Sequence, residues 1–209
     1  MFLIGQYDSP FVRRVAIAAT LYGIPFEHRP WSTFGDGDEI APFNPLRRVP
    51  TLVLDNSQVL IDSAYILDWL DEQAGDKALI AVSGPERQKA FYYIALATGF
   101  SDKCVALFYE KVLHKVTSDI WLSRCQAQVS AVLDVLERIR AEAKTQWLMG
   151  DVMLHPDIAL GCAVRHARDA HGDAIDWAPY PALLAHSATC EALPVFQAIQ
   201  QVFTGPSDS

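Results

Sequence analysis

The chain has 209 residues, a formal net charge of −8 and 51% hydrophobic residues, so it can bury a sizeable core in one large or two small domains. Nucleic-acid binding is disfavoured, because phosphate contacts need clustered Lys and Arg and no basic tract here is longer than a pair. No secretory signal precedes Gly5 and no apolar run approaches the roughly 18 residues of a membrane span, so we expect a soluble, cytoplasmic protein.

The first part of the chain predicts a small α/β domain. The expected elements are a strand at 2–5, a helix from Pro10, a strand begun by residues 23–26, a loop with a short helix at 31–43, strands at 51–54 and 58–61, and a helix from Ala64 to about Ala74. Ser9 followed by Pro10 is the usual N-cap and first position of a helix. This order of elements is typical of a thioredoxin-like domain, which we place at residues 1–77.

The segment Asn44-Pro45-Leu46-Arg47-Arg48-Val49-Pro50-Thr51-Leu52 has an unusual feature. Proline cannot donate to a sheet ladder, yet Pro50 opens an apolar strand. If the Val49–Pro50 peptide bond is cis, the turn presents the backbone N–H and C=O of Val49 outward, where an extended peptide can pair as an added strand. The segment therefore predicts a ligand site made of backbone groups.

Asp62 and Ser63 lie where a predicted strand ends and a helix begins. Free N–H groups at a helix N-terminus attract a carboxylate, and Asp62 beside them can pair with an ammonium group. A carboxylate and an ammonium together describe an α-amino acid. The alternatives are an ordinary acid at a helix start for Asp62 and an N-cap for Ser63.

The rest of the chain predicts helices only, after a linker at 76–84. The expected helices are 86–114, 118–143, a buried central helix around 157–164, and two short helices after Pro181 and Pro194, and together they make an all-helical domain at 85–209. Its four cysteines, Cys104, Cys125, Cys162 and Cys190, are far apart and lack the spacing of metal ligands. We interpret them as small core residues and expect no metal.

These motifs resemble those of the cytosolic glutathione S-transferase family, in its serine-type, bacterial-like form. The family's Asn-Pro-x-x-(Lys/Arg)-Val-Pro-x-Leu run is matched by residues 44–52, and its (Glu/Asp)-Ser pair by Asp62 and Ser63. The resemblance implies a thioredoxin-like domain followed by a helical one, a cytoplasmic homodimer, and a transferase of the detoxification type. It also implies glutathione as co-substrate and a small hydrophobic electrophile as the second substrate.

The resemblance also implies the site residues. Ser9 would be the catalytic residue, with Phe11, Arg48, Val49, Pro50, Asp62 and Ser63 contacting glutathione. A hydroxyl that donates to the sulfur, together with a helix dipole, would lower a thiol pKa of about 8.5 by about two units and make thiolate the main species. The alternatives are that Ser9 only caps its helix, or that Tyr7 donates to the thiol. No cysteine precedes Cys104, so disulfide-reducing chemistry is disfavoured.

Several alternatives stay open at this point. The same site would serve a glutathione-dependent isomerase or dehalogenase, and a binding module that kept the fold without activity is a third candidate. Leu154 stands where the family carries a capping Ser or Thr before Asp157, so His155 or a water is expected to take that role. Arg13 and Arg14 are expected at the surface or in a subunit contact. Aromatic residues at 91–93, 100, 108 and 109 are candidates for the electrophile site, or core residues.

Overall fold

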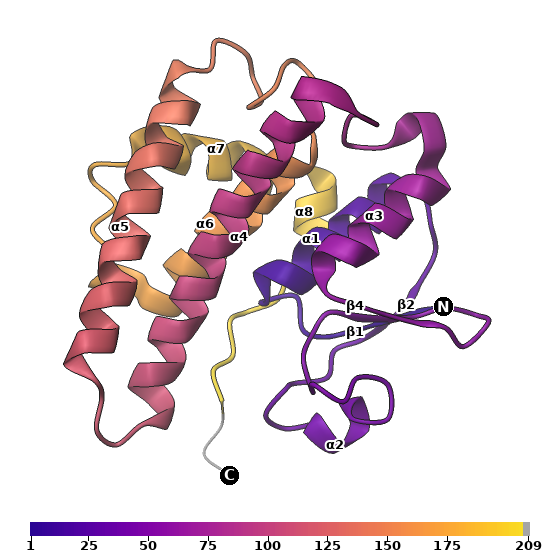
Figure 1. Cartoon of the computed structure of the whole chain (residues 1–209), viewed down its shortest axis with the longest axis horizontal. Helices are drawn as coiled ribbons and strands as arrows, with labels where there is room; N and C mark the ends of the chain where they lie inside the picture. Colours follow the sequence, from indigo (N-terminus) through magenta and orange to yellow (C-terminus); the bar gives the residue numbers. More distant parts are fainter. Residues whose placement is uncertain (207–209) are drawn as a thin grey trace. The chain divides into compact units, whose positions relative to one another are not determined.

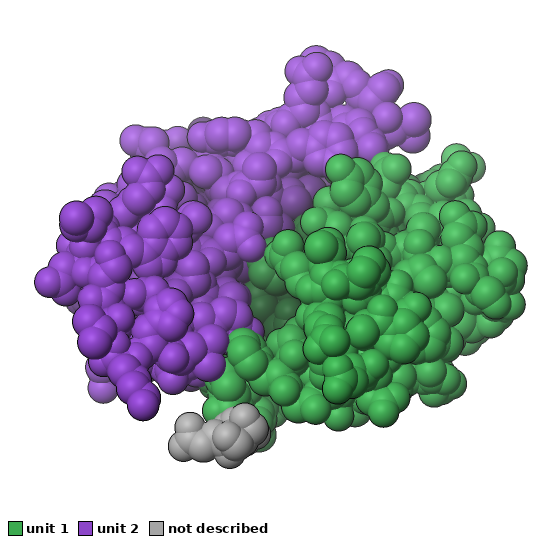
Figure 2. Space-filling model, turned by 60° about the horizontal axis from the view of Figure 1, so that its bottom comes forward, with its two compact units in different colours: residues 1–80, 193–209 green, residues 81–192 purple. Residues whose placement is uncertain are grey.

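The structure is a computed structural model that describes residues 1–206 of the chain (Figure 1). The chain divides into two compact units. Unit 1 contains residues 1–80 and the segment that begins at Leu193, and unit 2 contains residues 81–192 (Figure 2). This division differs from the predicted boundary, which assigned everything after residue 85 to the helical domain. The segment after Leu193 belongs to unit 1 because the Arg13 guanidinium binds the backbone carbonyls of Phe196 and Ile199.

Unit 1 is built on a four-stranded mixed sheet. Its elements are β1 (Phe2–Ile4), α1 (Pro10–Leu21), β2 (Glu27–Arg29), α2 (Gly37–Ile40), β3 (Thr51–Val53), β4 (Val59–Ile61), α3 (Ser63–Ala74), a 3-10 turn (Gly75–Lys77) and α8 (Pro194–Ala198). The strand order is β2-β1-β3-β4, with β1 parallel to β2 and antiparallel to β3. The predicted α/β architecture is confirmed, and the predicted hairpin is the antiparallel pair β3–β4.

The helices of unit 1 cover both faces of this sheet. Figure 1 shows α1 and α3 on one side of the strands and α2 on the other. Ile4 and Val53 pack with Ile40 of α2. Successive strand residues face opposite sides, so Leu3 and Leu52, which are paired in register, face α1 and α3. Burial on both faces explains why the central strands β1 and β3 are almost wholly apolar, whereas the edge strand β2 consists of Glu27, His28 and Arg29.

Unit 2 is helical throughout. Its elements are α4 (Gly84–Leu113), α5 (Asp119–Glu142), α6 (His155–His171), a 3-10 turn (Gly172–Ala174) and α7 (Pro181–Glu191). The predicted central helix is α6, whose first ten residues are all buried. All four cysteines are buried and none forms a disulfide among residues 1–206, which confirms their interpretation as core residues.

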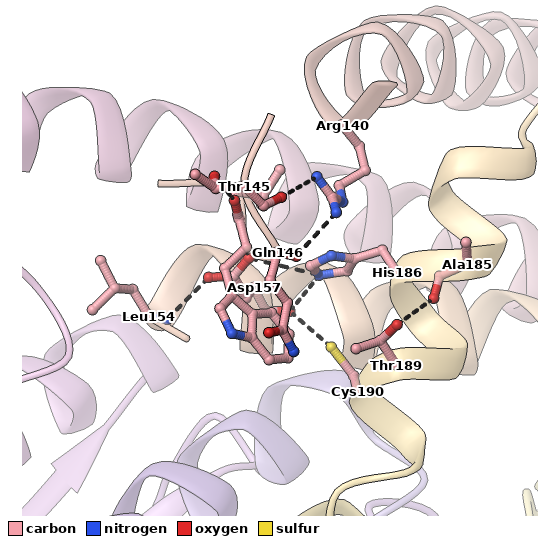
Figure 3. A network of polar contacts seen from close by, with 11 residues as sticks. Arg140, Thr145, Gln146, Leu154, Asp157, Ala185, His186, Thr189 and Cys190 are labelled. Carbon is pink, nitrogen blue, oxygen red and sulfur yellow. Dashed lines mark hydrogen bonds and ion pairs between the residues drawn. The ribbon is translucent and has the colours of Figure 1, made fainter. Parts of the chain in front are cut away.

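A buried carboxylate organises the start of α6 (Figure 3). Asp157 accepts the backbone N–H of Leu148 at 2.8 Å and that of Leu154 at 2.9 Å. Leu154 offers no side-chain oxygen, so the N–H of Asp157 donates instead to the backbone carbonyl of Leu154 at 3.0 Å. The backbone carbonyl of Leu154 thus accepts the N–H that a side-chain cap at this position would bind. Desolvation raises the pKa of Asp157, although the hydrogen bonds from the two N–H groups act in the opposite direction and lower it.

His186 lies against the same residue. Its Nε2 atom is 3.3 Å from the backbone carbonyl of Asp157, and its Nδ1 atom is buried without a hydrogen-bond partner among the described residues. Burial lowers the pKa of His186 to about 4. The ring is therefore neutral in the folded protein at neutral pH, where Nε2–H can donate to the carbonyl.

We expect stability to fall as the pH drops from about 6.5 to about 4, because the unfolded chain takes up a proton at His186 in this range and the folded chain does not. The pKa of His186 is about 2.5 units lower in the folded chain than in the unfolded chain. This difference corresponds to a loss of about 3 kcal/mol in the free energy of unfolding at the acid end of the range. Urea unfolding at a series of pH values measures this slope. His186→Gln keeps a donor for the carbonyl but cannot be protonated, so it should flatten the slope. A variant with the same slope as the parent would contradict the assignment to His186.

Candidate active site

The loop between β1 and α1 brings two predicted site segments together. Gly5 has a φ of +129°, and a Cβ added there would lie 2.5 Å from Cγ2 of Val12 and 2.8 Å from Cβ of Val49. Only glycine allows this close approach. As a result, the turn before Pro50 lies directly against the start of α1, where Ser9 is found.

Ser9 is the N-cap of α1, as the sequence predicts. Its Oγ accepts the backbone N–H of Val12 at 3.4 Å, a long hydrogen bond. This bond uses a lone pair of the oxygen and leaves the hydroxyl proton available, and no acceptor for that proton is found among residues 1–206. Capping and donation to a ligand are therefore compatible at Ser9.

Tyr7 is held by its ring. The ring stacks on the imidazole of His28 with centroids 3.7 Å apart and planes 4° from parallel. His28 in turn places Nε2 at 2.8 Å from the carbonyl oxygen of Gly5. Desolvation raises the pKa of Tyr7 to about 12, so its hydroxyl stays protonated at neutral pH and remains an alternative donor.

The Val49–Pro50 peptide bond is cis. Asn44, which is buried, supports the turn before it by donating to the carbonyl of Arg48 at 2.9 Å and to the hydroxyl of Thr51 at 3.0 Å. The N–H and C=O of Val49 make no hydrogen bond within the part of the chain that the structure describes. An extended peptide that pairs with these two groups would therefore not have to displace another hydrogen bond within this range.

The start of α3 differs from its prediction in one respect. Asp62, not Ser63, is the N-cap, and its carboxylate accepts the N–H of Ala64 at 2.9 Å from a backbone with a φ of 72°. Ser63 is the first residue of the helix and is 3% exposed. Its hydroxyl accepts two bonds from Arg14, at 3.1 Å from Nε and 2.7 Å from Nη2. The N-cap alternative for Ser63 is therefore wrong.

Arg14 is the residue that the sequence reasoning missed. Arg13 and Arg14 are 3% and 4% exposed, so the expectation that they lie at the surface was wrong. The signal was present in the sequence, because the apolar residues around them leave α1 without a polar face, and a buried guanidinium requires acceptors. Arg14 places a positive charge directly behind Ser63, which favours an anion at the start of α3.

The other predicted site residues make fewer described contacts with Ser9, Val49 and Ser63. Arg48 is exposed, while its neighbour Arg47 pairs with Asp38 at 3.0 Å. Phe11 is half-buried on the first turn of α1, and Pro50 is buried. The candidate aromatic residues of α4 do not share one environment, since Phe100 is fully buried in the core of unit 2 whereas Phe91 and Tyr92 are about half exposed.

A cavity of about 530 Å³ in unit 2 has a charged lining, which includes Arg165, Arg168, Asp169 and Glu191. This lining does not match the apolar site expected for an electrophile. Within residues 1–206, no group of His, Cys, Asp and Glu side chains converges as a metal site. No helix in that range is both long and apolar enough to cross a membrane.

Comparison with known proteins adds an independent line of support. Residues 3–78 match the family model of the glutathione S-transferase N-terminal domain, and residues 119–189 match that of the C-terminal domain. The chain is 30% identical over 165 residues to the uncharacterized GST-like protein YibF of Escherichia coli K12, a match that covers 78% of this chain and 80% of that protein. It is 26% identical over 208 residues to a maleylpyruvate isomerase of Ralstonia sp, covering 94% and 95% of the two chains.

A solved structure shows the same fold over nearly the whole length. A glutathione S-transferase from Methylobacterium radiotolerans, crystallised in complex with glutathione sulfonate, superposes with a TM-score of 0.90 at 28% identity. The superposition covers 99% of this chain and 97% of that one. The two matched domains, the similarity to the Escherichia coli protein and the shared fold show that the chain belongs to the glutathione S-transferase family.

Proposed function

We propose that the chain binds glutathione in unit 1 and activates its thiol with the hydroxyl of Ser9 for attack on an apolar electrophile. The observation that carries the proposal is the hydroxyl proton of Ser9, which has no acceptor among residues 1–206 and lies in the loop that packs against Val49. The complex of the Methylobacterium relative with glutathione sulfonate supports the same ligand.

In the proposed binding mode, a different group of the protein binds each part of the tripeptide. The N–H and C=O of Val49 pair with the cysteinyl backbone of glutathione as an added strand. The α-carboxylate of the γ-glutamyl end lies at the start of α3, near Ser63 and the charge of Arg14, and its ammonium group pairs with Asp62. Arg48 meets the glycyl carboxylate from its exposed position. The sulfur then faces Ser9 at the N-terminus of α1, where hydroxyl and helix dipole both favour the anion.

A glutathione-affinity column followed by a conjugation assay tests the proposal, with a generic aromatic halide as electrophile. We expect retention on the column, elution by free glutathione, and a conjugate formed faster than without protein. A protein that binds glutathione but forms no conjugate above background would contradict the transferase and leave the non-catalytic module and the isomerase. Absence of both binding and activity would contradict the proposal as a whole.

A glutathione-dependent isomerase is the second candidate, because the maleylpyruvate isomerase of Ralstonia sp matches 94% of this chain. In an isomerase the thiolate adds to the substrate and is released again, so glutathione is not consumed. Quantifying free thiol and product with a panel of electrophiles and cis-unsaturated acids separates the two reactions. Loss of thiol equal to product formed indicates a transferase, and product without loss of thiol indicates an isomerase.

We expect Asp62→Asn to weaken glutathione binding about two- to five-fold at low salt, since an exposed ion pair contributes up to about 1 kcal/mol. Asparagine caps a helix as well as aspartate does and tolerates a positive φ, so the stability of α3 should not change. Calorimetric titration at low and high salt measures the affinity, with the unfolding midpoint as control. Equal affinities of parent and variant at low salt would remove Asp62 from the ammonium site.

A further inference from the structure

The segment that follows α8 lies against the loop that carries Ser9. The backbone N–H of Tyr7 donates to Oε1 of Gln201 at 3.1 Å, and the backbone N–H of Thr204 donates to Oδ2 of Asp8 at 3.0 Å. These partners are 194 and 196 positions apart in the chain. In Figure 1 the yellow segment beyond α8 runs past the N-terminal end of α1. The two residues immediately before Ser9 are thus each bonded to the C-terminal segment.

The beginning of this segment is anchored to α1. Arg13 donates from Nε to the carbonyl of Ile199 at 2.8 Å and from Nη2 to that of Phe196 at 3.0 Å, and its guanidinium also lies 5.3 Å from the centre of the Phe196 ring. Hydrogen bonds from a charged donor are stronger than neutral ones, and Arg13 is almost fully buried. The position of Gln201 is therefore fixed only two residues after an anchored carbonyl.

The same loop is held on its other side by the sheet. Gly5 is bonded through its carbonyl to the ring of His28, on which the ring of Tyr7 stacks. The backbone of Ser9 is held by its N–H, which donates to the carbonyl of Gln6 at 3.2 Å, and by its carbonyl, which accepts the N–H of Arg13 at 2.9 Å. Among the described residues, its side chain has only the weak 3.4 Å bond from Val12. The direction of its hydroxyl consequently depends on the order of the loop before it, which the sheet and the C-terminal segment both restrain.

We propose that Gln201 is a positioning residue for Ser9, which acts by holding the backbone of Tyr7 so that the Ser9 hydroxyl points at the thiol. This inference rests on the proposed role of Ser9. Gln201 contributes an oxygen acceptor to the loop and takes no part in the chemistry. A small displacement of a donor weakens stabilisation of the thiolate without removing the binding groups at Val49, Asp62 and Ser63.

The test compares the same substitution at two neighbouring glutamines. Gln201→Met keeps the length of the side chain and removes the acceptor, whereas Gln200 is exposed and has no hydrogen-bond partner among residues 1–206, so Gln200→Met is the matched control. We expect Gln201→Met to raise the pKa of the bound glutathione thiol by about half a unit to one unit. Glutathione affinity should stay within about two-fold of the parent, since no binding group is removed.

The outcomes are distinguishable from a failure of the proposed function. If Ser9→Ala leaves the thiol pKa unchanged, both the role of Ser9 and this inference are wrong. If Ser9→Ala raises the pKa but Gln201→Met behaves like Gln200→Met, only the inference is wrong. A lower unfolding midpoint in Gln201→Met with an unchanged thiol pKa would also overturn it, because that result describes a merely structural contact. A double variant Ser9→Ala/Gln201→Met with no shift beyond Ser9→Ala would support action through Ser9.

Discussion

Replacing Ser9 by alanine is expected to raise the pKa of the bound glutathione thiol by about one to two units, because a charge-assisted hydrogen bond to the thiolate is lost while the dipole of α1 remains. With the thiol pKa moved from about 6.5 to between about 7.5 and 8.5, the thiolate fraction at about pH 6.5 falls about five- to fifty-fold. At about pH 9 both proteins should hold mostly thiolate, so their fractions nearly agree. Thiolate absorbance of the complex as a function of pH measures this directly, without dependence on the second substrate.

Two further variants make this result specific. Ser9→Thr keeps both the hydroxyl and the acceptor for Val12, so its pH profile should stay close to that of the parent. Tyr7→Phe keeps the ring that stacks on His28 and removes only the phenol hydroxyl. A profile that shifts in Tyr7→Phe and stays in place in Ser9→Ala would assign thiol activation to Tyr7.

The largest loss of stability is expected for Asp157→Ala, at about 3 to 5 kcal/mol, because the buried N–H of Leu148 and the part-buried N–H of Leu154 would both lose their acceptor. Asp157→Asn keeps one acceptor oxygen, so its free energy of unfolding should lie between those of the parent and the alanine variant. Urea unfolding followed by circular dichroism measures the difference.

Asp169 on the same helix provides the matched control. Its side chain is 31% exposed and pairs with Arg165 at 2.5 Å, so Asp169→Ala should cost at most about 1 kcal/mol. Equal losses in Asp157→Ala and Asp169→Ala would mean that the buried carboxylate does not organise the start of α6. We place the glutathione site in unit 1, whereas Asp157 belongs to unit 2. An unchanged glutathione affinity therefore checks that the folded fraction of each variant is intact.

The local features of the fold could be predicted because they depend on neighbouring residues. Ser9-Pro10 predicts the start of α1, the apolar runs on either side of residues 55–57 predict the hairpin, and the apolar stretch after Asp157 predicts the buried helix α6. Each signal is contained within a few residues of the sequence. The choice of Asp62 over Ser63 as N-cap was not predictable in this way, since either side chain can cap a helix.

The long-range contacts could not be predicted from the sequence. Arg14 and Ser63 are 49 positions apart, and Arg13 is 186 positions from Ile199, so no local pattern links them. The assignment of α8 to unit 1 depends on these contacts and was missed for the same reason. The site residues as a group came from the family resemblance, because a serine before a helix has a complete structural explanation as a cap. Their roles, and the homodimer, remain predictions.

A crystal structure of the protein with glutathione tests the central claim most directly. We predict that the cysteinyl backbone pairs with the N–H and C=O of Val49, and that the sulfur lies within hydrogen-bonding distance of Oγ of Ser9. A tripeptide bound elsewhere, or a sulfur turned away from the start of α1, would contradict the proposed activation of the thiol.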